Sequence, residues 1–106
     1  MSDVKWLSLL GLATRARKVI SGEDVVLKEV RRERVRLVLI ADDASSNTKK
    51  KMLDKCAYYD VPIRIVSDRK TLGKAVGKGE RVVIGVIDEG FAKKIISLVD
   101  ECRGGM

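Results

Sequence analysis

The spacing of apolar and polar positions along the chain predicts helices that alternate with short strands. Leu7, Leu10 and Ala13 recur at helical intervals near the amino terminus and predict a first helix. A second helix is expected to begin at the turn of residues 21–24, where Ser21 and Asp24 have the spacing of a capping box and Ser21 is expected to accept from the Asp24 amide. The expected helices cover about residues 3–14, 24–33, 46–58, 68–76 and 89–101.

Four apolar segments between these helices predict strands. Residues 37–41 and 81–87 are continuous apolar runs, the pattern of central strands that are covered on both faces. Residues 63–66 follow Pro62, which cannot donate to a ladder, so they are expected at or near an edge, and a short strand is expected near residues 18–20. This order predicts an α/β fold, a three-layer α/β/α sandwich around a small four-stranded mixed sheet. A length of 106 residues favours a single domain over residues 1–106.

The charge of the chain favours a polyanionic partner. Lys and Arg number 22 against 15 Asp and Glu, which gives a net charge of +7. Eight bases and four acids lie in residues 15–36, six bases and two acids in residues 64–81, and three bases and four acids from residue 88 onward. The first two segments are therefore predicted to form one basic face. No apolar run approaches the roughly 18 residues needed to span a bilayer, so we expect a cytoplasmic protein with no membrane partner.

The chain lacks the commonest general base of enzymes. It has no histidine, and Cys56 and Cys102 are its two cysteines, so neither a zinc site nor a nucleophile paired with histidine is available. Residues 73–81 resemble a phosphate-binding loop, but three residues separate their glycines rather than four, and the segment precedes a strand. Asp42 and Asp43 are adjacent without a third metal ligand, and a turn capped by Ser45 or Ser46 explains that segment better. We expect no catalysis, cofactor or metal.

The turn at Gly22 is the most informative candidate site. It opens a helix, and free backbone amides at the positive end of a helix can meet a phosphate or the edge of a base. Asp24, Lys28 and Arg32 are spaced at i, i+4 and i+8, so they lie on one side of that helix. A solvated stripe of ion pairs is the alternative explanation of the same spacing.

The order of these segments resembles the kink-turn-binding family of ribosomal proteins, and most closely its small bacterial YlxQ-type members. The resemblance covers nearly the whole chain and is carried by residues 9–18 (LLGLATRARK), 21–24 (SGED), 37–48 (LVLIADDASSNT) and 72–77 (LGKAVG). It implies the α/β/α sandwich and a monomer that binds sharply bent RNA with tandem sheared G·A pairs, in the ribosome or another ribonucleoprotein.

The resemblance also implies which residues contact RNA. Gly22 matches the glycine that opens the family's second helix, and Lys28 and Arg32 match basic positions beyond it. Archaeal and eukaryotic members have Asn-Glu where this chain has Asp24 and Val25, so Glu23 or Asp24 is expected to accept from guanine. A second contact is implied at the loop before the last strand. The expected RNA-binding residues are Lys18, Gly22, Glu23, Asp24, Lys28, Arg32, Lys78, Gly79, Glu80, Arg81 and Val82.

Two other functions fit the same sequence. The first is a protein-interaction or ribosome-assembly factor whose basic face meets an acidic partner. The second is a small-molecule-binding α/β enzyme, which would need a paired acid and base that the sequence does not reveal.

Overall fold

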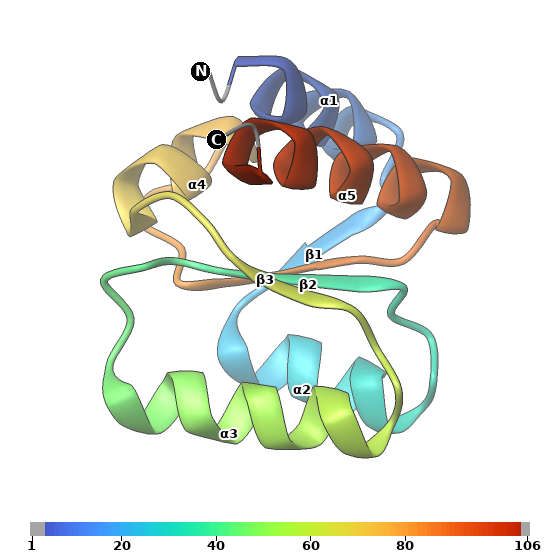
Figure 1. Ribbon diagram of the computed structural model, residues 1–106, viewed down its shortest axis with the longest axis vertical. Helices are drawn as coiled ribbons and strands as arrows, with labels where there is room; N and C mark the ends of the chain where they lie inside the picture. The colour runs from blue at the N-terminus through green and yellow to red at the C-terminus, as the bar shows by residue number, and fades with distance from the viewer. Residues whose placement is uncertain (1–3, 105–106) are drawn as a thin grey trace.

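A computed structural model of the chain describes residues 4–104, and side chains to residue 102. Five helices and four strands alternate along these residues (Figure 1). Their bounds are α1 Val4–Arg15, β1 Val19–Ser21, α2 Glu23–Arg31, β2 Leu37–Ile40, α3 Ser46–Tyr58, β3 Ile63–Ile65, α4 Arg69–Ala75, β4 Val83–Val86 and α5 Glu89–Gly104. Most agree with the predicted ranges to within three residues, and the expected start of the first helix at residue 3 lies outside the described residues.

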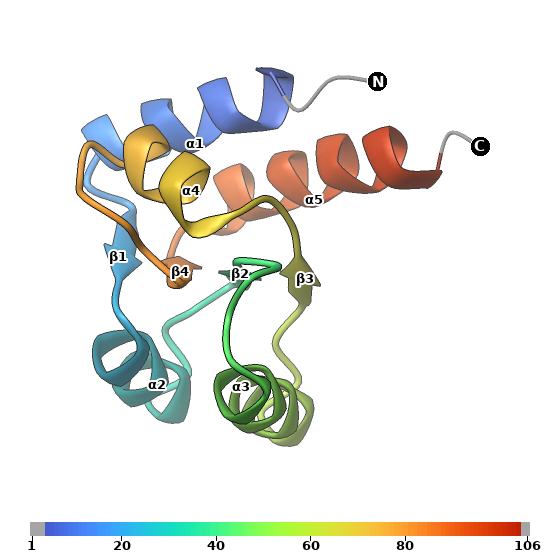
Figure 2. The same ribbon diagram turned by 90° about the vertical axis from the view of Figure 1, so that its left-hand side faces the viewer.

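The four strands form one mixed sheet in the order β1-β4-β2-β3. The strands β2 and β4 are central, as their continuous apolar runs predict, and β3 is at an edge. The helix α3 connects β2 to β3, and these two strands are parallel, whereas β4 is antiparallel to both of its neighbours. Figures 1 and 2 show α1, α4 and α5 over one face of the sheet and α2 and α3 over the other. The predicted three-layer sandwich is confirmed.

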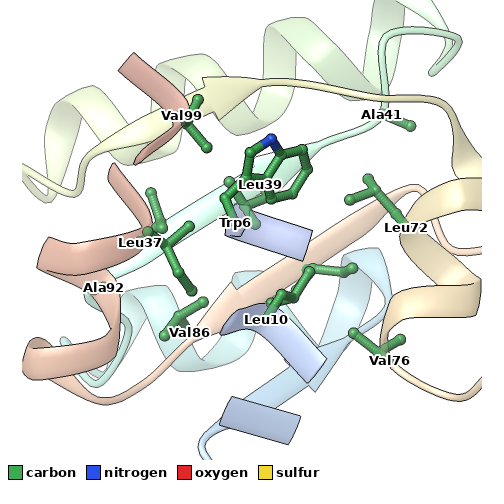
Figure 3. Packing of buried hydrophobic residues seen from close by; sticks show 12 residues of the cluster. Trp6, Leu10, Leu37, Leu39, Ala41, Leu72, Val76, Val86, Ala92 and Val99 are labelled. Carbon is green, nitrogen blue, oxygen red and sulfur yellow. The ribbon is translucent and has the colours of Figure 1, made fainter. Parts of the chain in front are cut away.

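The core lies on both faces of the sheet because side chains alternate along the central strands. Leu37 and Leu39 of β2 belong to the cluster under α1, α4 and α5, whereas Val38 and Ile40 belong to the cluster over α2 and α3. Figure 3 shows the first cluster, in which Trp6 packs among aliphatic side chains. This packing holds the helix ends in fixed positions at the two ends of the strands.

The second helix begins differently from the prediction. Gly22 is its N-cap residue and provides no side-chain hydrogen bond, so the predicted capping box at Ser21 is wrong. Ser21 is instead the last residue of β1, where it pairs with Ile84, and Gly22 lies between it and the first residue of α2. The predicted strand at 81–87 is shorter than expected at both ends: Arg81 and Val82 belong to the loop before β4, and Ile87 belongs to the connection after it.

The two ends of the strands carry different parts of the chain. Chain direction places the turn at Gly22 and the loops of residues 41–45, 66–68 and 76–82 at one end, on the left in Figure 1, which we call the pocket end. The connections of residues 16–18, 32–36, 59–62 and 87–88 lie at the other end, on the right, which we call the far end.

Candidate functional site

A pocket with a volume of about 680 Å³ opens at the pocket end. Four separate parts of the chain form its wall: the β1–α2 turn, the start of α3, the start of α4 and the loop before β4. The lining residues are Ser21, Gly22, Glu23, Ser45, Thr48, Arg69, Lys78, Glu80, Arg81, Val82 and Val83. The two segments that the sequence proposes as RNA contacts therefore meet at one pocket, which Gly22 and Glu23 line on one side and all of residues 78–82 except Gly79 line on the other.

Gly22 is required at the turn for its backbone conformation. Its φ of 104° and ψ of 137° are rarely adopted by residues with a side chain, yet a Cβ placed on Gly22 would meet no atom within 4 Å. The amide of Gly22 donates to the carbonyl of Val83 at 2.9 Å, which fixes the turn to β4. Because no side chain caps α2, the amides of its first turn remain available to an acceptor on a ligand.

Glu23 is held by the neighbouring helix α3. The Thr48 hydroxyl donates to its Oε1 at 2.9 Å, and the Lys51 Nζ donates to its Oε2 at 2.7 Å. The hydrogen bond from Lys51, with that from Thr48, lowers the pKa of Glu23 below its usual value. Glu23 therefore joins the start of α2 to α3, and Asp24 is the exposed carboxylate beside the turn.

The loop of residues 76–82 is shaped by backbone contacts with α4. Gly77 has a φ of 71° at the end of the helix, and the Lys78 amide donates to the carbonyl of Gly73 at 2.8 Å. The Arg81 amide donates to the carbonyl of Arg69 at 3.1 Å. The guanidinium of Arg81 also donates to the Ser21 hydroxyl at 3.3 Å, which connects the loop to β1.

Arg69 is a pocket residue that the sequence did not single out. Its guanidinium donates to the Asp43 carbonyl at 2.7 Å, and its amide donates to the Asp43 carboxylate at 3.1 Å. Asp43 thus orients Arg69. Ser45, one of the two residues predicted to cap the third helix, accepts from the Thr48 amide at 3.1 Å and so caps α3. The rule that ligand sites form beyond the carboxyl ends of strands could have indicated Arg69, which lies four residues after β3.

The remaining predicted residues do not all join the pocket. Asp24 and Lys28 are exposed on α2, and Gly79 lies in the loop against Gly73. Arg32 is the C-cap of α2 and Lys18 precedes β1, so both lie at the far end. The prediction of one basic face is therefore wrong: β1 and α2 cross the molecule, and most bases of residues 15–36 lie at the opposite end from Gly22.

The chain belongs to the ribosomal protein L7Ae/L30e/S12e/Gadd45 family, whose sequence model matches residues 4–96. It is 59% identical over 100 residues to the RNA-binding protein YlxQ of Bacillus subtilis, covering 94% of this chain and 100% of that protein. The solved structure of a protein with unknown function from Bacillus halodurans C is 55% identical, with a TM-score of 0.90 over 92% of this chain and 98% of that one.

The fold extends to distant RNA-binding proteins. The Giardia lamblia 15.5kD RNA binding protein has a TM-score of 0.80 at 22% identity, covering 92% of this chain and 86% of that one, which shows a shared fold. The family is described by its ribosomal proteins, and the Bacillus subtilis relative is named as an RNA-binding protein rather than an enzyme, which confirms the prediction that the chain is not an enzyme. In residues 4–104, no helix is long and apolar enough to cross a membrane, and no group of three or more acidic or cysteine side chains could hold a metal ion.

Proposed function

We propose that this chain is an RNA-binding protein that recognises kink-turn RNA with tandem sheared G·A pairs, through the pocket between Gly22 and the loop of residues 78–82. It acts as a single-domain monomer in the cytoplasm, on RNA of the ribosome or another ribonucleoprotein. The observation that carries the proposal is that two segments about 60 positions apart in the sequence line the same pocket.

The pocket has the chemistry of an RNA site. Uncapped amides at the start of α2 and the exposed carboxylate of Asp24 can pair with the edges of bases, since an amide donates and a carboxylate accepts. Lys78, Arg69 and Arg81 supply positive charge around the same opening. Phosphate contacts of this kind position an RNA, whereas contacts to base edges specify it.

The helices add a favourable field. The amino-terminal ends of α2 and α3 both lie at the pocket end, and each helix of this length carries about half a positive charge there. Their carboxyl-terminal ends lie at the far end. The arrangement therefore favours an anion at the pocket independently of the side chains.

A gel-shift titration tests the proposal. Purified protein is titrated against an RNA with two consecutive G·A pairs beside a bulge and against an unbroken duplex of the same length and base composition. We expect about tenfold or stronger binding of the kinked RNA, a difference of about 1.4 kcal/mol. Equal affinity for the two RNAs would show that the kink is not what the pocket recognises.

A further inference from the structure

The fold places exposed basic residues at both ends of the sheet. At the far end, Arg15, Arg17, Lys18 and Arg36 are all exposed, and we call these four residues the far basic surface. Lys18 and Arg36 lie on either side of the end of β4, because the Ile87 amide donates to the Lys18 carbonyl and the Arg36 amide donates to the Val86 carbonyl. Two interstrand spacings, or about 10 Å, therefore separate their backbones.

None of these four cations forms an ion pair within residues 4–102, where no carboxylate oxygen lies within 4.0 Å of their charged nitrogens, although Arg36 lines a second pocket together with the acids Glu33, Asp60 and Glu89. There is no acid in residues 4–22. The carboxylate of Asp88, which lies after β4, accepts a hydrogen bond from the amide of Phe91 at the start of α5. Arg32 and Arg34 differ, since both contact Glu29, at 3.6 and 3.7 Å.

Stabilisation of a helix end explains only part of this surface. Cations near the carboxyl terminus of a helix offset its dipole, an effect that falls off within the last turn. Arg15 is in the last turn of α1, and Arg17 and Lys18 follow it closely. Arg36 lies four residues beyond the C-cap of α2, directly before β2, so the dipole does not account for it.

Arg17 has an unfavourable backbone conformation for an arginine. Its amide and that of Lys18 close the end of α1 by donating to the carbonyls of Thr14 and Ala13, an arrangement that usually has glycine at the first position. Arg17 has a φ of 62°, which costs a residue with a side chain about 1 kcal/mol or more relative to glycine. The chain thus carries a positive charge where folding alone favours glycine.

We propose that the far basic surface binds the phosphate backbone of an RNA helix separate from the RNA in the pocket, so that the protein contacts RNA at both ends. Arginine suits this partner because its planar guanidinium pairs with phosphate through two parallel hydrogen bonds. A protein partner fits less well, since interfaces centre on buried apolar anchors, whereas the large exposed apolar side chains at this end, Leu12 of α1 and Tyr58 of α3, lie on helices that cover opposite faces of the sheet.

Binding of an unbroken RNA duplex tests this inference without involving the kink. The duplex is made longer than 31 Å, the largest extent of the protein, and its affinity is measured by fluorescence anisotropy over a range of salt concentrations. The Lys18→Gln/Arg36→Gln variant is compared with Lys5→Gln/Lys94→Gln, which removes the same charge from the exposed outer sides of α1 and α5. Circular dichroism first shows that both variants are folded.

We expect the wild-type protein and the Lys5/Lys94 variant to share one slope of log K against log salt concentration. The Lys18/Arg36 variant should show a slope smaller by about 1.5, since two phosphate contacts are lost. The inference would be overturned if the two variants had equal slopes, or if the wild-type protein did not bind the duplex at low salt. In either case an acidic protein would be the next partner to test. A short-armed kinked RNA should bind the Lys18/Arg36 variant as tightly as it binds the wild-type protein. If none of the three proteins bound this RNA more tightly than the unbroken duplex, that result would instead contradict the proposed function.

Discussion

Gly73 lies so close to Gly79 that a methyl group on Gly73 would overlap the Gly79 carbonyl oxygen. Gly73 is buried in α4, and the loop of residues 76–82 lies directly over it. The atom that such a methyl group would meet belongs to the backbone, so it cannot rotate away as a flexible side chain would. The shape of this wall of the pocket therefore depends on a residue that does not line the pocket.

Replacing Gly73 with Ala should displace the loop and destabilise the protein. We expect a loss of about 1–3 kcal/mol in the free energy of unfolding, as for other overpacked sites, together with weaker binding of kinked RNA. Gly79→Ala is the matched control: a Cβ there meets no atom within 4 Å, and its φ is not positive, so its stability should change by about 0.5 kcal/mol or less. Urea denaturation measures both. Equal stabilities of the two variants would show that the loop does not depend on this contact.

Exchanging the charges of Glu23 and Lys51 should separate positioning from direct contact. If Glu23 only holds the start of α2 against α3, Glu23→Lys should weaken the preference for kinked RNA, and Glu23→Lys/Lys51→Glu should restore most of it, because the 2.7 Å ion pair is re-formed in reverse. The double variant has the same net charge as the wild type, so general attraction to RNA is unchanged. Failure of the double variant to recover, with both proteins folded, would indicate that the Glu23 carboxylate itself contacts RNA.

The same ion pair predicts how stability depends on pH. The pKa of Glu23 is lowered in the folded protein, first by the hydrogen bond from Lys51, so the folded state binds this proton less tightly than the unfolded state does. Its contribution is therefore fully present above 4.5, the ordinary pKa of a glutamate, and is lost as the pH falls through the lower pKa of the folded state. Glu23→Gln should lower the urea midpoint at pH 7 and approach the wild-type midpoint in strong acid. If the difference between the two urea midpoints stayed constant from pH 7 to strong acid, the ion pair could not be its cause.

Lys28 and Arg32 should differ in their effect on RNA binding, although the sequence pairs them on one side of α2. Arg32 lies about two helical turns beyond Asp24, so roughly 12 Å of helix separates it from the residue beside the Gly22 turn. It also contacts Glu29. Lys28→Gln should reduce the salt dependence of kinked-RNA binding by about 0.7–0.9 in the log–log slope, whereas Arg32→Gln should leave it unchanged. Equal reductions, measured by anisotropy, would mean that the RNA extends along the whole of α2.

Local patterns were sufficient to predict most of the fold. The apolar runs that became β2 and β4 are continuous because helices cover both faces of the central strands, and Ser45 caps α3 through a bond that spans three residues. The start of α2 was mispredicted because a capping-box spacing does not reveal that Ser21 is paired with Ile84 in the sheet. That pairing joins residues 63 positions apart, which local spacing cannot show.

The candidate site was predicted only in part for a similar reason. Gly22 and the loop containing Arg81 were identified from sequence, but their meeting in one pocket depends on the antiparallel pairing of β1 with β4. Counting charges along the chain placed Lys18 beside Gly22, whereas the intervening strand β1 carries them to opposite ends of the sheet. Arg69 was missed because its contact with Asp43 also spans the fold.

Amide chemical shifts of the labelled protein, recorded with and without one equivalent of short-armed kinked RNA, test the central claim most directly. The claim predicts that the amides of Gly22 and Glu23 and those of Arg81 and Val82 shift together in the same complex, because both segments line one pocket. The amides next to Lys18, at the far end, should remain unchanged. Shifts confined to one of the two segments, or concentrated at the far end, would contradict recognition of the kinked RNA by the pocket.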